Sequence, residues 1–158
     1  MKDTPFPTPE KPRWTRHVAA LLLALLLAAV WGSVVQTQWN LQALAGVGVD
    51  ISAALRLSTT LQDLLGFAPV YAGIVAAGWL PALGVAALLA RRWPAGRTLL
   101  LATAAGAGVV AAIRSIDAVA PMPVFIDATR HWPGLLAMTM GAVVGGWLYA
   151  RLTARGGC

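Results

Sequence analysis

Charged and polar side chains that could bind or catalyse lie at the edges of long apolar blocks in this chain. Two arginines each stand three residues from an aspartate, one of them beside a histidine, and two amide residues follow the first apolar block: Arg114, Asp117, Asp127, Arg130, His131, Gln36 and Asn40. An arginine can hold a carboxylate or a phosphate through paired N–H groups. His131 with an aspartate could move protons, but no nucleophile of suitable spacing accompanies it.

We call these seven residues the outer polar cluster, because the topology predicted below places them toward the outer side of a membrane. Two further interpretations of this cluster do not require catalysis. In the first, the charges pair and pin helix ends together; Arg114 and Asp117 can meet on one helical face. This interpretation is favoured because an arginine in apolar surroundings is costly unless it is paired or reaches the interface. In the second, the cluster is a pocket that opens outward, where Arg114 or Arg130 holds an anion such as a lipid phosphate or a carboxylate.

Several cofactor and enzyme classes lack the residues that they need. Haem b between spans requires two facing imidazoles, but His17 and His131 fall on opposite sides of the predicted membrane. A single cysteine, Cys158, leaves no redox pair, disulfide framework or thiolate metal site. The sequence also lacks an HExxH segment and a glycine-rich phosphate loop followed by lysine. We therefore expect no cofactor and no metal; the sequence favours a non-enzymatic protein and leaves enzymatic activity open.

The composition indicates that these residues are positioned by membrane-spanning helices. Of the 158 residues, 58% are hydrophobic and 11% are charged, whereas soluble domains carry roughly 25% charged residues. A helix needs about 20 apolar residues to cross the hydrocarbon layer. Four stretches approach or reach this length, namely 18–35, 69–90, 99–116 and 132–152. We predict an all-α membrane protein whose four transmembrane helices form an antiparallel bundle.

The basic residues predict the orientation of this bundle. A pI near 10.8 is typical of nucleic-acid binders, but here the charges lie at block edges, so we expect no nucleic acid partner. With the N-terminus in the cytoplasm, the inner side holds nine of the 12 lysines and arginines: Lys2, Lys11, Arg13, Arg16, Arg91, Arg92, Arg97, Arg151 and Arg155. Because cytoplasmic loops carry such an excess, we predict that both termini are cytoplasmic.

The N-terminal region allows two topologies. Residues 1–16 are rich in proline and charge, which predicts a disordered cytoplasmic tail before a membrane domain at 17–155. The first block could be a cleaved signal peptide, because a basic segment precedes it and Gly32 offers a small residue for cleavage. It continues without a helix-breaking residue to Val35, which favours an uncleaved anchor; cleavage would leave three spans.

The long segment between the first two spans predicts an amphipathic outer helix over 50–65. Apolar residues recur there at near-helical spacing, at Ile51, Leu55, Leu61 and Leu65. Asp50 or Ser52 can cap its start, and Gly66 is expected to end it. Such a helix would lie on the outer membrane face or over the bundle.

Small residues at four-residue spacing predict the helix contacts. Close approach of small residues drives much of helix association in lipid. The third span carries Ala104, Gly108 and Ala112, and the fourth carries Gly141 and Gly145. We predict that these two stripes face each other.

Three segments carry a resemblance to a known group of proteins. The stretches SVVQTQWNLQAL, RLSTTLQDLLGFAPVYAGIVA and GAVVGGWLYARL resemble small four-span inner-membrane proteins of proteobacteria that have no assigned activity. The likeness covers most of residues 33–152. It implies a four-span topology and a location in the bacterial inner membrane, and it assigns no functional residue.

These patterns support two functional hypotheses. The first is a non-enzymatic accessory or scaffold protein, because the spans lack intramembrane acids and carry small-residue stripes. The alternative is a lipid or small-anion binding protein, either a carrier or a lipid-modifying enzyme, that uses the outer polar cluster. The expected partners are membrane lipids, together with other membrane proteins or further copies of the chain.

Overall fold

In the computed structural model of this protein, the described residues are 13–119 and 126–154. They form four α-helices, α1 (Arg13–Gly46), α2 (Ala53–Arg92), α3 (Arg97–Val119) and α4 (Trp132–Leu152), with short 3-10 helices η1 (Pro94–Gly96) and η2 (Asp127–Arg130) before α3 and α4. Each of the four is long and apolar enough to cross a membrane. The predicted all-α, four-span fold is therefore confirmed, although most of the expected tail at 1–16 lies outside the described residues.

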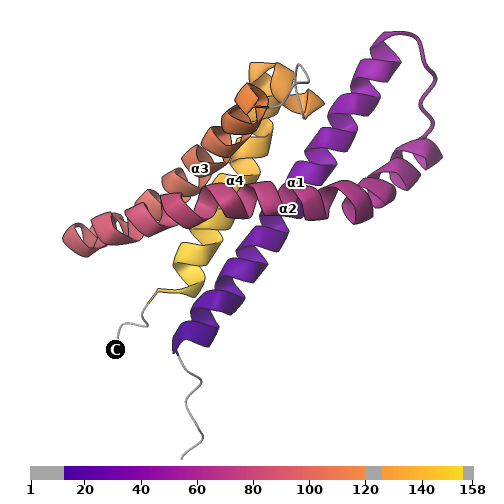
Figure 1. The fold of residues 1–158 in the computed structure, drawn as a ribbon. Helices are drawn as coiled ribbons and strands as arrows, with labels where there is room; N and C mark the ends of the chain where they lie inside the picture. Colours follow the sequence, from indigo (N-terminus) through magenta and orange to yellow (C-terminus); the bar gives the residue numbers. More distant parts are fainter. Residues whose placement is uncertain (1–12, 120–125, 155–158) are drawn as a thin grey trace, which may run out of the picture.

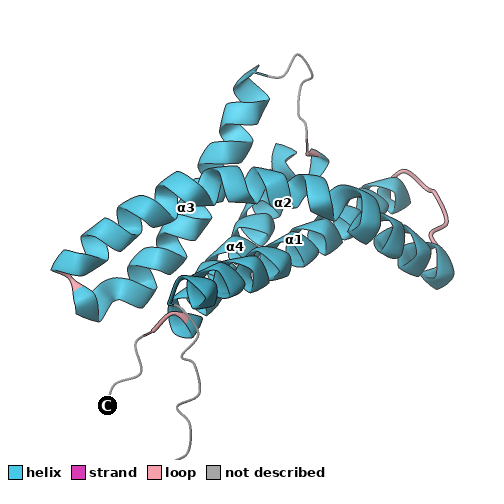
Figure 2. Ribbon diagram, turned by 60° about the horizontal axis from the view of Figure 1, so that its bottom comes forward, coloured by secondary structure: helices cyan, strands magenta, loops and turns pink. Residues whose placement is uncertain are grey.

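The four helices pack as a ring in which each helix contacts two neighbours. α1 packs against α2 and α4, and α3 packs against the same two helices on the other side. The ends of α1 and α2 that meet at the 47–52 loop lie to one side of α3 and α4 (Figures 1 and 2). We call the end of the bundle that carries this loop and η2 the outer end, and the opposite end the inner end.

Trp79 of α2 fills the centre of the ring. Its side chain is 1% exposed, and its indole N–H donates to the backbone oxygen of Ala105 in α3 at 3.0 Å. The facing residue of α4 is Gly145, where an added Cβ would lie 2.7 Å from the Trp79 ring. Trp31 of α1 instead donates to the backbone oxygen of Ala137 at 2.8 Å. Trp79 is buried between helices, whereas Trp31 is 41% exposed, and each satisfies its N–H group on a neighbouring backbone.

Two arginines tie the inner end together. Arg16 of α1 donates to the backbone oxygens of Leu152 and Ala154 at 2.8 and 2.6 Å. Arg97, at the start of α3, donates to the Ala150 oxygen at 2.8 Å and to the Thr153 hydroxyl at 2.7 Å. Three of these four bonds go to backbone carbonyls at or just after the end of α4, where a helix lacks its own donors. The start of α1, η1 and the end of α4 therefore lie at one end of the bundle, as an even number of spans requires.

The predicted outer helix and second span form one continuous helix. α2 runs through 40 residues from Ala53 to Arg92, with Pro69 and Pro81 inside it. Its start is capped as expected, because the Ser52 hydroxyl accepts a bond from the Leu55 N–H at 3.2 Å. Gly66 does not end the helix. A glycine costs a helix only about 1 kcal/mol, whereas breaking backbone hydrogen bonds in lipid costs several kcal/mol per group.

The outer part of α2 turns its polar side toward α1 and its leucines outward. The Thr37 hydroxyl of α1 donates to the Asp63 carboxylate of α2 at 2.6 Å. Leu57, Leu61 and Leu65 on the other side are 63%, 54% and 83% exposed. We call residues 37–46, the 47–52 loop and residues 53–65 the outer hairpin. Its interior is polar, and its exterior carries these leucines together with the exposed Gln42, Ser58 and Gln62.

Candidate functional site

Contacts inside the chain occupy much of the predicted outer polar cluster. Asp127 and Arg130 of η2 form an ion pair, with 2.6 Å between Oδ1 and Nε. Gln36 of α1 is buried, and its Oε1 accepts a hydrogen bond from the Ala128 N–H at 3.0 Å. Because Ala128 lies in η2, Gln36 fixes this segment against α1 across the outer end of the bundle.

The remaining cluster residues lie where α1, α3 and α4 approach the outer end. The Arg114 guanidinium lies over the Trp132 ring, 5.7 Å from its centroid, and this cation–π contact joins the end of α3 to the start of α4. Asp117 is on the last turns of α3, and the exposed His131 precedes α4 without a side-chain capping bond. The buried Oδ1 of Asn40 has no hydrogen-bond partner among the described residues. A ligand-binding role for this cluster stays a prediction.

Sequence reasoning missed a second polar site, inside the outer hairpin. A hollow of about 520 Å³ lies there, lined by Gln38, Trp39, Gln42, Ala43 and Arg56. We call it the Arg56 hollow. α1 supplies four of its residues, and the first turns of α2 supply the arginine. All but one of its lining residues carry a polar group, in contrast to the largely apolar linings of the α2–α3 surface and of a smaller hollow between α1 and α2.

A closed set of hydrogen bonds holds the arginine of this hollow. Arg56 donates from Nη1 to Oε1 of Gln38 at 3.0 Å. Gln38 donates from Nε2 to the Thr60 hydroxyl at 3.0 Å, and Thr60 donates to the backbone oxygen of Arg56 at 2.7 Å. Because a guanidinium can only donate, the Gln38 amide has one consistent orientation. The guanidinium is thus positioned by a neutral group.

The sequence did contain a signal for this site. Arg114 and Arg130 each have an aspartate three residues away, at a spacing that permits pairing on a helix. The residues three and four positions on either side of Arg56 are Ser52, Ala53, Thr59 and Thr60. Arg56 is therefore the outer arginine without a local acidic partner, and such a charge needs another way to be satisfied near lipid.

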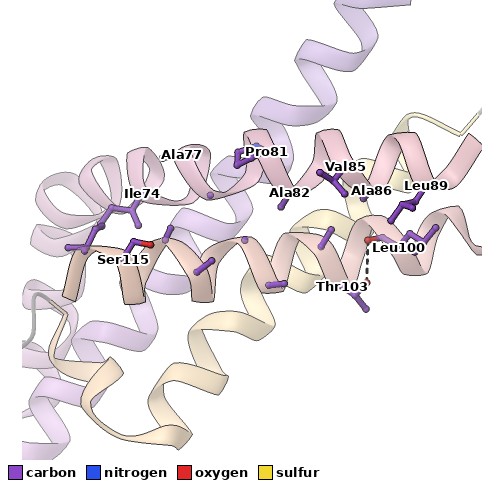
Figure 3. A pocket seen from close by; sticks show the side chains of 17 residues that line it. Ile74, Ala77, Pro81, Ala82, Val85, Ala86, Leu89, Leu100, Thr103 and Ser115 are labelled. Carbon is purple, nitrogen blue, oxygen red and sulfur yellow. Dashed lines mark hydrogen bonds between the residues drawn. The ribbon is translucent and has the colours of Figure 1, made fainter. Parts of the chain in front are cut away.

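A long apolar groove runs between α2 and α3 (Figure 3). It has a volume of about 880 Å³ and extends from Leu89 and Leu100 to Ile74 and Ile116. Small residues line its middle: Ala77, Gly78, Pro81, Ala82, Ala104, Ala107, Gly108, Ala111 and Ala112. Thr103 and Ser115 carry the hydroxyls of this α2–α3 groove, and Thr103 donates its own to the Leu99 oxygen at 2.8 Å.

The floor of the α2–α3 groove is a contact between two backbones. Gly78 of α2 lies against Gly108 of α3; a Cβ added at Gly108 would lie 2.6 Å from the Gly78 carbonyl oxygen and 2.9 Å from Cβ of Ala82. A Cβ added at Gly78 would in turn collide with the Gly108 carbonyl. Because alanines flank this crossing, no large side chain fills the surface above it.

The two predicted small-residue stripes do not face each other. Ala104, Gly108 and Ala112 line the groove beside α2. Gly141 lies against Trp31 of α1, and Gly145 lies against Trp79 of α2. The α3–α4 contact uses two glycines outside the stripes, with Gly106 of α3 against Val143 and Gly146 of α4 against Ala105. Spacing found helix-packing residues, but it does not choose among the possible partners, which are the two neighbouring helices of the ring and, for Gly145, the Trp79 side chain of the helix opposite.

No protein-family model, curated protein or solved structure matches this chain. Within residues 13–119 and 126–154, no three His, Cys, Asp or Glu side chains are grouped so that they could hold a metal ion. The two features from which a function can be argued are therefore the α2–α3 groove and the polar groups of the outer end.

Proposed function

We propose that this protein is a non-enzymatic accessory or scaffold protein of the bacterial inner membrane, with both termini in the cytoplasm. It binds a transmembrane helix of another chain in the α2–α3 groove. The partner is another membrane protein or a second copy of this chain. The orientation rests on the excess of lysine and arginine in the segments at the inner end, and the bacterial location rests on the resemblance of three segments.

The observation that carries this proposal is the small-residue lining of the α2–α3 groove. Helix pairs in lipid gain little from hydrophobic burial and depend on close van der Waals packing, which small residues permit. Between Leu100 and Ile116 the groove follows α3 for about 24 Å, most of the roughly 30 Å hydrocarbon thickness. The exposed alanines Ala107 and Ala111 would let an incoming helix approach α3 closely.

The alternative, lipid or small-anion binding at the outer polar cluster, has less support. Its Gln36, Asp127 and Arg130 already bond within the chain, and its Arg114 lies over an aromatic ring. An acyl chain in the α2–α3 groove would be a second route to lipid binding. An acyl chain is thinner than a helix and has no fixed shape, so it gains less van der Waals contact than a helix does from a continuous run of alanines and glycines.

Site-specific photocrosslinking in native membranes tests the occupant of the groove. A photoreactive amino acid replaces Val85, which lines the groove and is 58% exposed. The matched position is Leu22, 60% exposed on α1 and outside the described grooves. We expect the Val85 probe to form a protein adduct that the Leu22 probe does not form. The adduct mass distinguishes a different membrane protein from a second copy.

A groove-filling variant gives the same test a quantitative form. The double variant Ala107→Leu, Ala111→Leu adds bulk only at exposed positions, so it should leave the bundle folded. We expect it to lower the Val85 adduct about tenfold, which corresponds to a loss of about 1.4 kcal/mol of binding. The control Ala19→Leu, also exposed, should leave the yield unchanged. Adducts with lipid alone, or a yield that the double variant does not alter, would contradict the proposal.

A further inference from the structure

We propose that the Arg56 hollow binds a single oxyanionic group, a phosphate or a carboxylate, at the outer boundary of the membrane. This site is separate from the outer polar cluster predicted from the sequence and from the α2–α3 groove. No residue that lines the hollow also lines the groove. The inference therefore does not depend on the proposed scaffold function, and the variants that test the one leave the other intact.

The charge of Arg56 has no counter-ion within the described residues. The side chain is half-buried. The outer hairpin carries two acids: Asp50 lies exposed in its loop, and Asp63, two turns after Arg56 along α2, accepts a hydrogen bond from Thr37; neither forms an ion pair with Arg56 within the described residues. An arginine near lipid is costly unless a counter-charge or water satisfies it. The fold thus leaves a positive charge that an external anion can neutralise.

The Arg56 guanidinium is oriented by its bond to Gln38. The bond from Nη1 to Gln38 uses one of its five N–H donors. The structure gives the Nε and Nη2 groups no partner among the described residues, and a guanidinium presents such groups as a planar fork that matches two oxygens of a phosphate or carboxylate. Gln38 is itself fixed by Thr60. The fork is therefore ordered before an anion arrives, which lowers the entropy that binding costs.

The rest of the lining adds a second donor and an apolar wall. Gln42 is exposed, one turn after Gln38 on α1, and its side chain makes no hydrogen bond within the described structure. Its amide N–H₂ can donate to the same anion as Arg56. Trp39 forms an apolar wall, and its ring also contacts the start of α4 near Gly134. One cation, one free amide and one aromatic wall fit a single anionic group with an apolar attachment.

The hollow lies in a part of the molecule with a mixed exterior. Exposed leucines of the outer hairpin, Leu57, Leu61 and Leu65, alternate there with the exposed Ser58 and Gln62. Such a mixture suits the membrane interface, so we place the hollow where headgroups and water begin. Two sources supply an oxyanion at this depth, namely the phosphate of a lipid headgroup and a free anion from the outer solution. Their shared chemistry defines the site, and the experiment separates them.

Two probes test the site in phosphate-free maltoside micelles at constant ionic strength. The first is inorganic phosphate, and the second is phosphatidic acid mixed into the micelle. The indole N–H resonance of Trp39, assigned with Trp39→Phe, reports occupancy because this ring lines the hollow. We expect a saturable shift with at least one probe; a response to phosphate identifies a free-anion site, and a response to phosphatidic acid alone identifies a headgroup site.

The variants make the result specific. Arg56→Gln removes the charge and should weaken binding about tenfold, which corresponds to about 1.4 kcal/mol. Gln42→Ala removes an exposed side chain without internal bonds, so it should stay folded and weaken binding by a smaller factor. Arg130→Gln removes an equal charge from the Asp127 pair and should leave binding unchanged. Three results would each overturn the proposal: no saturable shift with either probe, equal binding by the parent and Arg56→Gln, or loss of binding in Arg130→Gln alone.

Discussion

Gly108→Leu is expected to lower the melting temperature of the purified protein by about 10 °C or more, or to prevent folding. A Cβ at this position already lies 2.6 Å from the Gly78 carbonyl oxygen. The obstacle is the backbone of α2, which cannot rotate away as a side chain can. A leucine would separate α2 from α3 along their whole crossing, and it would thereby remove the close van der Waals packing that is the main attraction between helices in lipid.

Gly73→Leu is the matched control for this prediction. Gly73 is an exposed glycine of α2, and a Cβ added to it would meet nothing within 4 Å. Leucine is a better helix former than glycine by roughly 1 kcal/mol, so this variant should be as stable as the parent or more stable. Thermal unfolding in mild detergent gives both values. Equal melting temperatures for Gly108→Leu and Gly73→Leu would show that α2 and α3 do not touch at this point.

Gly145→Leu should be destabilising by a different route, through the tryptophan at the centre of the ring. An added Cβ would lie 2.7 Å from the Trp79 ring and 2.9 Å from the backbone oxygen of Ala24. The larger side chain must displace Trp79, whose indole N–H then loses its bond to Ala105. Overpacking costs about 1–3 kcal/mol, and leaving a buried donor without its partner adds about 1–3 kcal/mol.

The displacement of Trp79 in Gly145→Leu can be measured separately from the loss of stability. Trp79 fluorescence in a variant that lacks the other tryptophans should shift to the red and become accessible to quenchers when Gly145 is replaced. Gly84→Leu, on the same helix as Trp79 and with nothing within 4 Å of an added Cβ, should keep the parent spectrum. If the emission maximum of Trp79 and its protection from quenchers were unchanged in Gly145→Leu, the contact between Gly145 and Trp79 would be contradicted.

The features predicted best from the sequence are those that depend on local stretches of the chain. The last span begins at Trp132 and ends at Leu152, as predicted, because Pro133 suits the first turn and polar residues bound the apolar run. The connection between Arg92 and Arg97, which contains η1, is so short that α2 and α3 must be neighbours. The boundary expected at Gly66 was wrong, because a glycine costs a helix only about 1 kcal/mol, less than the backbone hydrogen bonds that an interruption of α2 would break in lipid.

Features that depend on which helices meet could not be obtained from spacing. The stripe with Gly108 packs on α2, and Gly145 packs on Trp79. A four-residue repeat indicates that one face of a helix carries small residues, but it does not indicate which helix packs against that face. The same holds for the polar residues. Gln36 bonds to a segment 92 residues away, and Arg56 meets Gln38 across a loop. Neither contact follows from a local pattern, although the missing acidic neighbour of Arg56 was visible.

The four-span bundle with its inner end in the cytoplasm is tested most directly by the side of the membrane on which each end of the bundle lies. With Cys158→Ser as background, single cysteines are placed at exposed residues of the outer loop, the inner connection and the end of α4, in the variants Val47→Cys, Ala95→Cys and Ala154→Cys. A membrane-impermeant maleimide should label Val47→Cys in intact spheroplasts, and should label the other two only after the membrane is opened. Labelling of Ala95→Cys and Ala154→Cys from opposite sides, or of all three from outside, would contradict a bundle of four membrane-spanning helices.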